Sequence, residues 1–183
     1  MSRGLTLAEV LVGAGLSLVL LGVVVGLFLG AGNLWLHSSC RSELQQTAAL
    51  ALDRMVSDLR GSAAEGVSWD ADSRLSVRPV LDVDAEGRLT WDEQVTLYYV
   101  SHGSLWSRRE GLGLAAGPRV PAQELAALCA DGSSANAMAR DLQSFRVRGT
   151  PSLVRLELIL ARRLPSGEVV RFQLDRSVLI RTP

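Results

Sequence analysis

A long uncharged stretch near the start of the chain limits what this sequence can fold into. No residue from Val10 to Leu36 carries a charge. An α-helix rises about 1.5 Å per residue, so this stretch is long enough to cross a hydrocarbon core of about 30 Å. A secretory signal peptide has a shorter apolar core, of about 7 to 15 residues, followed by a cleavage site and a polar mature chain. We therefore predict one membrane-spanning helix.

The residues at the two ends of this stretch predict its orientation. Arg3 is the only basic residue ahead of the stretch, and Trp35 lies at its far end. Basic residues tend to stay in the cytoplasm, whereas an indole ring suits the boundary between membrane and water. We expect the N-terminus in the cytoplasm and the rest of the chain on the other side of the membrane.

Glu9 is a carboxylate placed at the front of the apolar run. An ionised acid inside a membrane helix costs about 2.5 to 3.5 kcal/mol on insertion scales unless it finds a partner. Glu9 is therefore a candidate functional residue. The alternative is an acid close to the membrane surface whose side chain reaches water.

The segment 4–11, which reads Gly-Leu-Thr-Leu-Ala-Glu-Val-Leu, resembles the processing site of type IV pilin-like proteins, the prepilins and pseudopilins. The resemblance implies cleavage between Gly4 and Leu5 by a prepilin peptidase, followed by N-methylation of Leu5. Leu5 stands where the family usually has Phe. The resemblance also implies that Glu9 pairs with the new amine of a neighbouring subunit and so sets the register of the filament.

Three glycines inside the run, Gly22, Gly26 and Gly30, recur every four residues and so share one face of the helix. Small residues on one face let another helix approach closely. One interpretation is tight helix packing in a filament core. The other is the general tolerance of membrane helices for Gly.

Beyond residue 36 the helical pattern continues but becomes amphipathic. The apolar positions of the stripe are Leu44, Ala48, Leu52, Met55 and Leu59. Gly61 offers a stop. We predict a helix from Leu5 to Arg60 and four regions: a leader at 1–4, a membrane and filament-core helix at 5–36, its amphipathic continuation at 37–60, and an extracytoplasmic β-rich domain at 61–183.

Apolar residues then alternate with polar ones, which is typical of strands. The expected strands cover residues 74–83, 94–100, 104–109, 142–148, 153–164 and 168–182, and a short helix is expected over 123–130. Turns are expected at 101–103 and 165–167, and Arg108 and Arg109 are expected on a solvated edge. The fold class is α+β, with the long helix packed on an antiparallel sheet.

The later segments narrow the resemblance. Residues 49–60 are similar to the post-membrane helix of the minor-pseudopilin J and minor-pilin W group. The strand pair 95–100 and 105–109 and the terminal strand ending at 178–181 resemble the same group. The resemblance thus extends along the chain in the order of that group.

Four acidic residues have the spacing of a calcium-binding loop. Asp82, Asp84, Glu86 and Glu93 occupy its first, third, fifth and twelfth positions, and Gly87 occupies the sixth. The alternation around them does not favour the flanking helices of such a loop. A hairpin turn at 85–87, between Val83 and Leu89, explains the same residues, so calcium and a turn remain two alternatives.

The other reactive side chains give weaker signals. Cys40 and Cys129 are the only cysteines, and sequence leaves open a disulfide or two free thiols. Neither has further ligands at zinc spacing. His37 and His102 are the only histidines and have no nucleophile motif beside them, so we expect no enzyme. Apart from calcium, no cofactor is expected.

We interpret the chain as a minor pilin or pseudopilin, a structural subunit with a priming or tip role in a type IV pilus or type II secretion pseudopilus. The resemblance implies a single-pass protein of the bacterial inner membrane with a periplasmic or extracellular domain. Its partners are then other pilins, prepilin peptidase, an inner-membrane platform with its ATPase, and a secretin. The zero formal charge does not indicate nucleic acid. The alternative is a membrane-anchored extracytoplasmic binding protein that does not polymerise.

Overall fold

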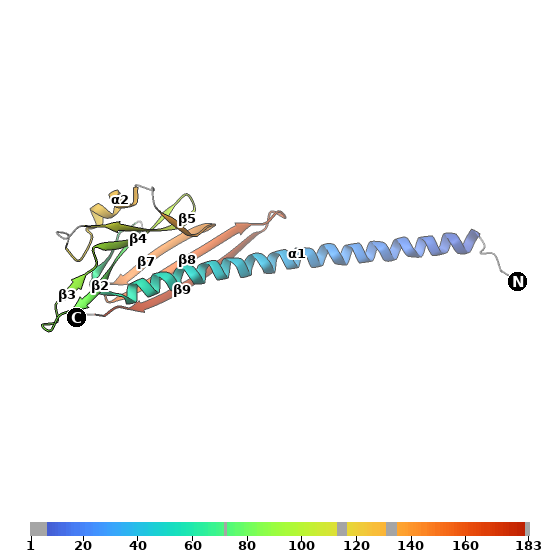
Figure 1. Ribbon diagram of the computed structural model, residues 1–183. Coiled ribbons are helices and arrows are strands. Elements are labelled where there is room, and N and C mark those ends of the chain that lie inside the picture. The colour runs from blue at the N-terminus through green and yellow to red at the C-terminus, as the bar shows by residue number, and fades with distance from the viewer. Residues whose placement is uncertain (1–6, 72, 113–116, 131–134, 182–183) are drawn as a thin grey trace. The chain divides into compact units, whose positions relative to one another are not determined.

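The computed structural model describes residues 7–71, 73–112, 117–130 and 135–181 (Figure 1). Its elements are α1 (Leu7–Arg60), β1 (Ser62–Trp69), β2 (Leu75–Val83), β3 (Leu89–Trp91), β4 (Gln94–Ser101), β5 (Ser104–Gly111), α2 (Ala122–Ala130), β6 (Asn136–Ala139), β7 (Leu142–Thr150), β8 (Leu153–Arg163) and β9 (Val169–Leu179). One long helix followed by antiparallel strands is an α+β fold, as predicted.

The chain divides into two compact units, Met1–Cys40 and Arg41–Pro183. The first contains the front of α1. The second contains the rear of α1 together with all the strands and α2. The helix ends at Arg60, directly before the Gly61 stop that the sequence indicates. The amphipathic half of the helix thus belongs to the globular unit.

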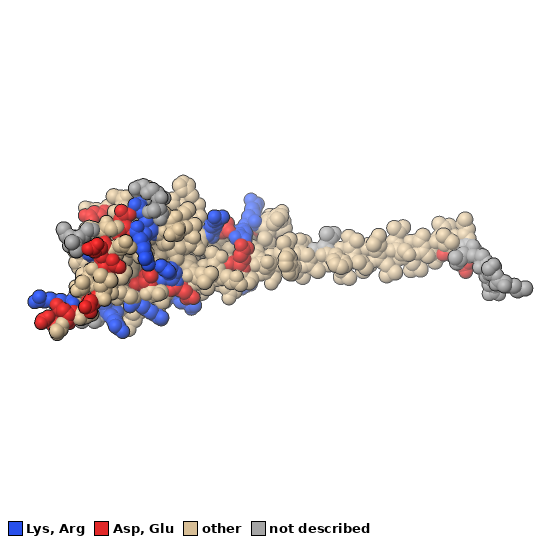
Figure 2. All heavy atoms as spheres, viewed as in Figure 1, with Lys and Arg blue, Asp and Glu red and all other residues tan. Residues whose placement is uncertain are grey.

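The front of α1 exposes its apolar side chains. Their exposed fractions run from 45% at Val24 to 80% at Leu7. Figure 2 shows this part of the helix almost without acidic or basic atoms, whereas such atoms are frequent over the globular unit. A helix that is apolar on all sides is expected in a membrane or among other apolar helices.

The rear of α1 supplies one side of the core of the globular unit. The predicted stripe is buried, and none of its five side chains is more than 1% exposed: Leu44, Ala48, Leu52, Met55 and Leu59. Full burial of one such side chain stabilises a fold by about 1.5 to 3 kcal/mol. This half of the helix is therefore held by packing, whatever its intrinsic helix propensity.

The larger sheet has six strands, in the order β1-β2-β4-β5-β6, with β3 paired to β2. β4 and β5 form the predicted hairpin, whose register runs from Gln94↔Gly111 to Ser101↔Ser104. His102 (φ 49°) and Gly103 (φ 66°) make its two-residue turn, because this turn type needs positive φ at both positions. One face of β4 packs under α2, in a cluster with Val120 and Leu125.

The smaller sheet has three antiparallel strands in the order β7-β8-β9. Alternate residues of β8, namely Val154, Leu156, Leu158 and Leu160, are fully buried. In β9, Val170 and Val178 are buried while Arg171 and Asp175 are exposed, which is the alternation expected of a strand. In the described chain β9 pairs with β8 alone and is an edge strand.

Three short or small-residue strands lie outside the predicted set. β3 and β6 have only 3 and 4 residues. β1 reads Ser-Ala-Ala-Glu-Gly-Val-Ser-Trp and has few of the β-branched residues that indicate a strand. It is placed by tertiary packing, because a Cβ on Gly66 would lie 2.3 Å from Trp91 Cζ3 and 2.8 Å from the Arg78 carbonyl oxygen.

This close packing generates the first prediction. Replacement of Gly66 by Ala forces a backbone carbonyl and an indole ring to move, so we expect it to lower the free energy of unfolding by about 1 to 3 kcal/mol. The matched control is Gly111→Ala, whose added Cβ meets no atom within 4 Å. Urea unfolding of the full chain in detergent, followed by tryptophan fluorescence, measures both. Equal effects of the two substitutions would contradict the packing at Gly66.

Candidate functional site

The apolar front of α1 is the first candidate site. Among the residues that the structure describes, α1 is the one helix long and apolar enough to span a membrane. Ser17, a polar residue of this part, bonds within the helix, since its Oγ donates to the Gly13 carbonyl at 2.8 Å. The segment therefore fits a transmembrane helix by both length and composition.

Glu9 lies in the first turn of α1. The N-terminal end of a helix carries a partial positive charge, which favours a carboxylate at this position. The residues that follow it, Val10 and Leu11, are 57% and 65% exposed. Gly4 and Leu5, the predicted processing residues, lie outside the described part of the chain.

The three glycines of the predicted packing face lie on open helix surface. A Cβ built on Gly22, Gly26 or Gly30 meets no atom within 4 Å. No atom of the described residues therefore requires glycine at these positions. They leave the helix backbone accessible to another helix, as either interpretation of their spacing allows.

Two polar contacts join the rear of α1 to the strands. The first is a hydrogen bond in which the Tyr98 hydroxyl donates to Asp58 Oδ2. Tyr98 is fully buried, and Arg54 Nε lies 3.7 Å from the same carboxylate oxygen. Burial, with a further contribution from the Asp58 hydrogen bond, raises the pKa of Tyr98 well above its ordinary value.

The second contact is a network centred on Arg162 of β8. Its Nη1 lies 2.6 Å from Glu43 Oε2 on α1, and its Nε lies 2.6 Å from Asp141 Oδ2 between β6 and β7. The two carboxylates raise the pKa of Arg162, so the guanidinium stays charged. Pairs with this exposure contribute modestly to stability, and their directionality helps to fix where β8 meets the helix.

The acidic segment forms a hairpin turn. Val83 pairs with Leu89, and Gly87 adopts φ 80°. Asp84 Oδ1 accepts the backbone N–H groups of Glu86, at 3.1 Å, and Arg88, at 2.7 Å. The hairpin alternative is therefore confirmed. Within the described ranges, no group of three or more His, Cys, Asp or Glu side chains is placed to hold a metal ion, so Asp82, Asp84, Glu86 and Glu93 are not gathered.

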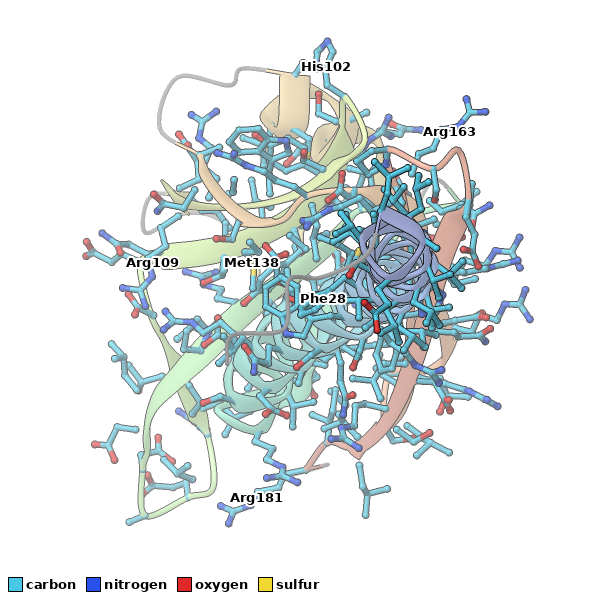
Figure 3. All side chains as sticks on the ribbon, turned by 90° about the vertical axis from the view of Figure 1, so that its right-hand side faces the viewer. Phe28, His102, Arg109, Met138, Arg163 and Arg181 are labelled. Atoms are coloured by element: carbon cyan, nitrogen blue, oxygen red, sulfur yellow. The ribbon has the colours of Figure 1, made fainter. Side chains whose placement is uncertain are left out.

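The structure also places the two cysteines and His102. Cys40 and Cys129 are both free and buried, and burial raises the pKa of the Cys129 thiol to about 11. His102 lies at the β4–β5 turn and points away from the domain (Figure 3). Its Nδ1 lies 2.8 Å from the hydroxyl of the adjacent Ser101.

The structure corrects the expectation for one arginine. Arg109 is exposed, but Arg108 is only 8% exposed, and its Nη2 lies 2.5 Å from Glu110 Oε2. Arg108 alternates with Arg109 along β5 and therefore points to the opposite face of the sheet. A charged residue in a strand is thus buried here because a carboxylate lies two residues further along the same face.

A second candidate site, for which the sequence gives no signal, is a cavity of about 650 Å³ in the globular unit. Arg60, at the end of α1, and Arg181, after β9, both line it. These two residues are far apart in the chain, and only the fold brings them to one surface. A pair of charges without a motif or a fixed spacing cannot be recognised from one sequence.

The Tyr98 hydrogen bond generates a second prediction. Tyr98→Phe leaves the Asp58 carboxylate without its donor, so we expect a loss of about 1 to 3 kcal/mol at neutral pH. The unfolded chain releases the tyrosine proton near its ordinary pKa of 10.0, before the folded chain does. The stability contributed by the protonated hydroxyl is therefore full below pH 10 and falls above it, by up to about 1.4 kcal/mol per pH unit.

Urea unfolding of the full chain and of the Tyr98→Phe variant between pH 8 and 11 tests this. The difference in free energy of unfolding between the two proteins should be constant below pH 10 and shrink above it. A difference that stays constant across the whole range would show that Tyr98 titrates normally in the folded protein.

Comparison with known proteins adds no family to this description. No family model, no curated protein and no solved structure matches the chain.

Proposed function

We propose that this chain is a pilin-like structural subunit, a minor pilin or pseudopilin that is processed by a prepilin peptidase and assembled into a type IV pilus or a type II secretion pseudopilus. The observation that carries the proposal is the composition of α1. One helix carries Glu9 in its first turn, continues through an uncharged apolar half, and ends as the buried stripe of a β-rich domain.

The exposed apolar half of α1 is suited to two successive environments. Its side chains need lipid while the subunit is in the membrane, and they need other apolar helices once it has left. Gly22, Gly26 and Gly30 offer a face on which a neighbouring helix backbone can approach. A segment of this kind serves both as membrane anchor and as filament core.

Glu9 supplies the register of assembly in this proposal. Cleavage after Gly4 frees a positively charged amine on Leu5, and the Glu9 carboxylate of an adjacent subunit pairs with it. An isolated carboxylate in an apolar filament core costs several kcal/mol, so subunits docked out of register are disfavoured. The mechanism is assembly and requires no chemical turnover by this chain.

The orientation follows from the flanking residues. Arg3 holds the leader in the cytoplasm, where the peptidase, the inner-membrane platform and its ATPase act, and the globular domain lies in the periplasm or outside the cell. Other pilins and a secretin complete the set of partners. A priming or tip position, in a type IV pilus or a type II secretion system, agrees with the J and W group that the chain resembles.

The competing function is a membrane-anchored extracytoplasmic binding protein that does not polymerise. The cavity lined by Arg60 and Arg181 favours it, since a binding protein needs a cavity of this size. The two functions differ in processing and in the role of Glu9, and both differences can be measured.

The third prediction concerns processing. Full chain extracted from native membranes should begin at N-methylated Leu5, as shown by the mass of its N-terminal peptide. Gly4→Val should abolish cleavage, because the peptidase cuts after this residue, whereas Gly13→Val inside the same helix should leave cleavage intact. Wild-type protein that retains Ser2 to Gly4 would refute the filament function and favour the anchored binding protein.

The fourth prediction concerns Glu9. The Glu9→Gln variant keeps the shape of the side chain without its charge, so we expect normal cleavage and methylation but at least a tenfold loss of the subunit from sheared filament fractions. This factor corresponds to about 1.4 kcal/mol, which is below the cost of the Leu5 ammonium that the variant leaves unpaired in an apolar core. The matched control, Ser17→Ala, removes a polar group of the same helix and should assemble normally. Equal recovery of all three proteins would exclude a register role for Glu9.

A further inference from the structure

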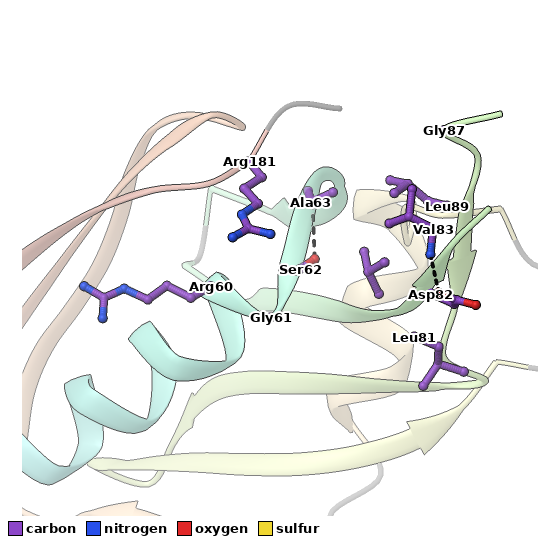
Figure 4. Close-up of a pocket in the computed structure, with 11 residues that line it drawn as sticks. Arg60, Gly61, Ser62, Ala63, Leu81, Asp82, Val83, Gly87, Leu89 and Arg181 are labelled. Carbon is purple, nitrogen blue, oxygen red and sulfur yellow. Dashed lines mark hydrogen bonds between the residues drawn. The ribbon is translucent and has the colours of Figure 1, made fainter. Parts of the chain in front are cut away.

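The cavity lined by Arg60 and Arg181, described above, lies wholly within the globular unit. The end of α1 and the start of β1 form one wall, and the β2–β3 hairpin forms the other (Figure 4). Its volume of about 650 Å³ is within the range of ligand sites, which is about 300 to 1,000 Å³. None of the residues that line it is among those that the proposed function uses for assembly.

One side of the cavity is apolar and exposed. Leu81 and Val83 of β2 both line it, with 64% and 54% of their surfaces exposed. Leu89 of β3, which pairs with Val83, lines it too. Large apolar side chains left exposed side by side are typical of interaction sites.

The other side carries two cations, of which Arg181 lies beside the start of β1, whereas the Arg60 side chain points away from the β2–β3 hairpin (Figure 4). Neither the Arg60 nor the Arg181 side chain forms an ion pair or hydrogen bond with any residue of the described chain. The one acidic residue of the lining, Asp82, accepts the Val83 backbone N–H at 2.8 Å. The charged groups of the lining therefore leave an excess of positive charge, which is complementary to an anionic group.

The cavity also borders an open strand edge. Asp84 N–H donates to the Arg88 carbonyl at 3.0 Å, so the backbone of Asp84 faces β3 and the backbone of the preceding Val83 faces the other way. On that side the backbone pairing ends at Val80, whose N–H donates to the Gly61 carbonyl at 3.0 Å. The Val83 carbonyl is therefore available to an added strand.

We propose that this cavity binds an extended segment of another polypeptide that carries an apolar side chain next to a carboxylate. The apolar side chain packs on Leu81 and Val83, and the carboxylate pairs with Arg181. Backbone pairing with the β2 edge gives the site its preference for a peptide over a lipid, because an acyl chain has no amide groups to bond there. The proposal goes beyond the filament function and applies equally to the anchored binding protein.

The test uses the full chain in lipid nanodiscs and a fluorescein-labelled peptide, Ser-Gly-Leu-Glu-Leu-Gly-Ser, with an amidated C-terminus. Fluorescence anisotropy gives its Kd. Replacing Glu by Gln in the peptide should weaken binding about tenfold, and replacing both Leu residues by Ser should weaken it at least as much. These two peptides test the chemistry on unaltered protein.

Protein variants then locate the site. Arg181→Gln should weaken binding about fivefold to tenfold, and Leu81→Ser should weaken it similarly. The matched control is Arg148→Gln, an exposed arginine of β7 away from the cavity. Retained circular dichroism spectra would show that each variant is folded.

Each outcome bears on the proposal. No measurable binding of the Leu-Glu-Leu peptide, or equal binding of the Glu and Gln peptides, would overturn it. An effect of Arg148→Gln equal to that of Arg181→Gln would show nonspecific attraction between charges and would also overturn it. Displacement of the peptide by micromolar decanoate would assign the cavity to a lipid carboxylate. None of these results depends on whether the chain is cleaved or assembled.

Discussion

The buried stripe on the rear of α1 is the interaction on which the globular unit depends. Leu44, Leu52 and Leu59 are almost completely excluded from solvent and span this half of the helix. The Tyr98–Asp58 hydrogen bond and the Arg162 network then join the helix to one strand of each sheet. Because apolar packing has little directionality, these polar contacts fix the position of each sheet along the helix.

The two halves of α1 use the same local structure for different purposes. The front half is uncharged and exposes apolar surface all round, so it needs partners from outside the chain. The rear half divides into an apolar face and a charged face, so the globular unit itself buries its apolar side chains. Glu9 is the exception in the front half, and the function that we propose depends on how that charge is paired.

Strong periodicity made most of the fold predictable. The α1 stop at Gly61, the β4–β5 hairpin and the long strands β8 and β9 follow from patterns within single segments. The sequence did not predict β1 and β6, because their small residues form strands only through tertiary packing, as at Gly66. The cavity lined by Arg60 and Arg181 was not predicted for a related reason, since no local pattern links residues from the two ends of the domain. Processing at Gly4 and Leu5 remains a prediction from the motif.

The β9 edge strand has a consequence for solubility. β9 has 11 residues and pairs on one side only within the described chain, so its other edge presents backbone groups that another strand can bond. Arg171, Asp175 and Arg176 are exposed along it, and charged side chains on an edge strand discourage edge-to-edge aggregation. Many copies of this domain can therefore be held close together without their sheets pairing edge to edge.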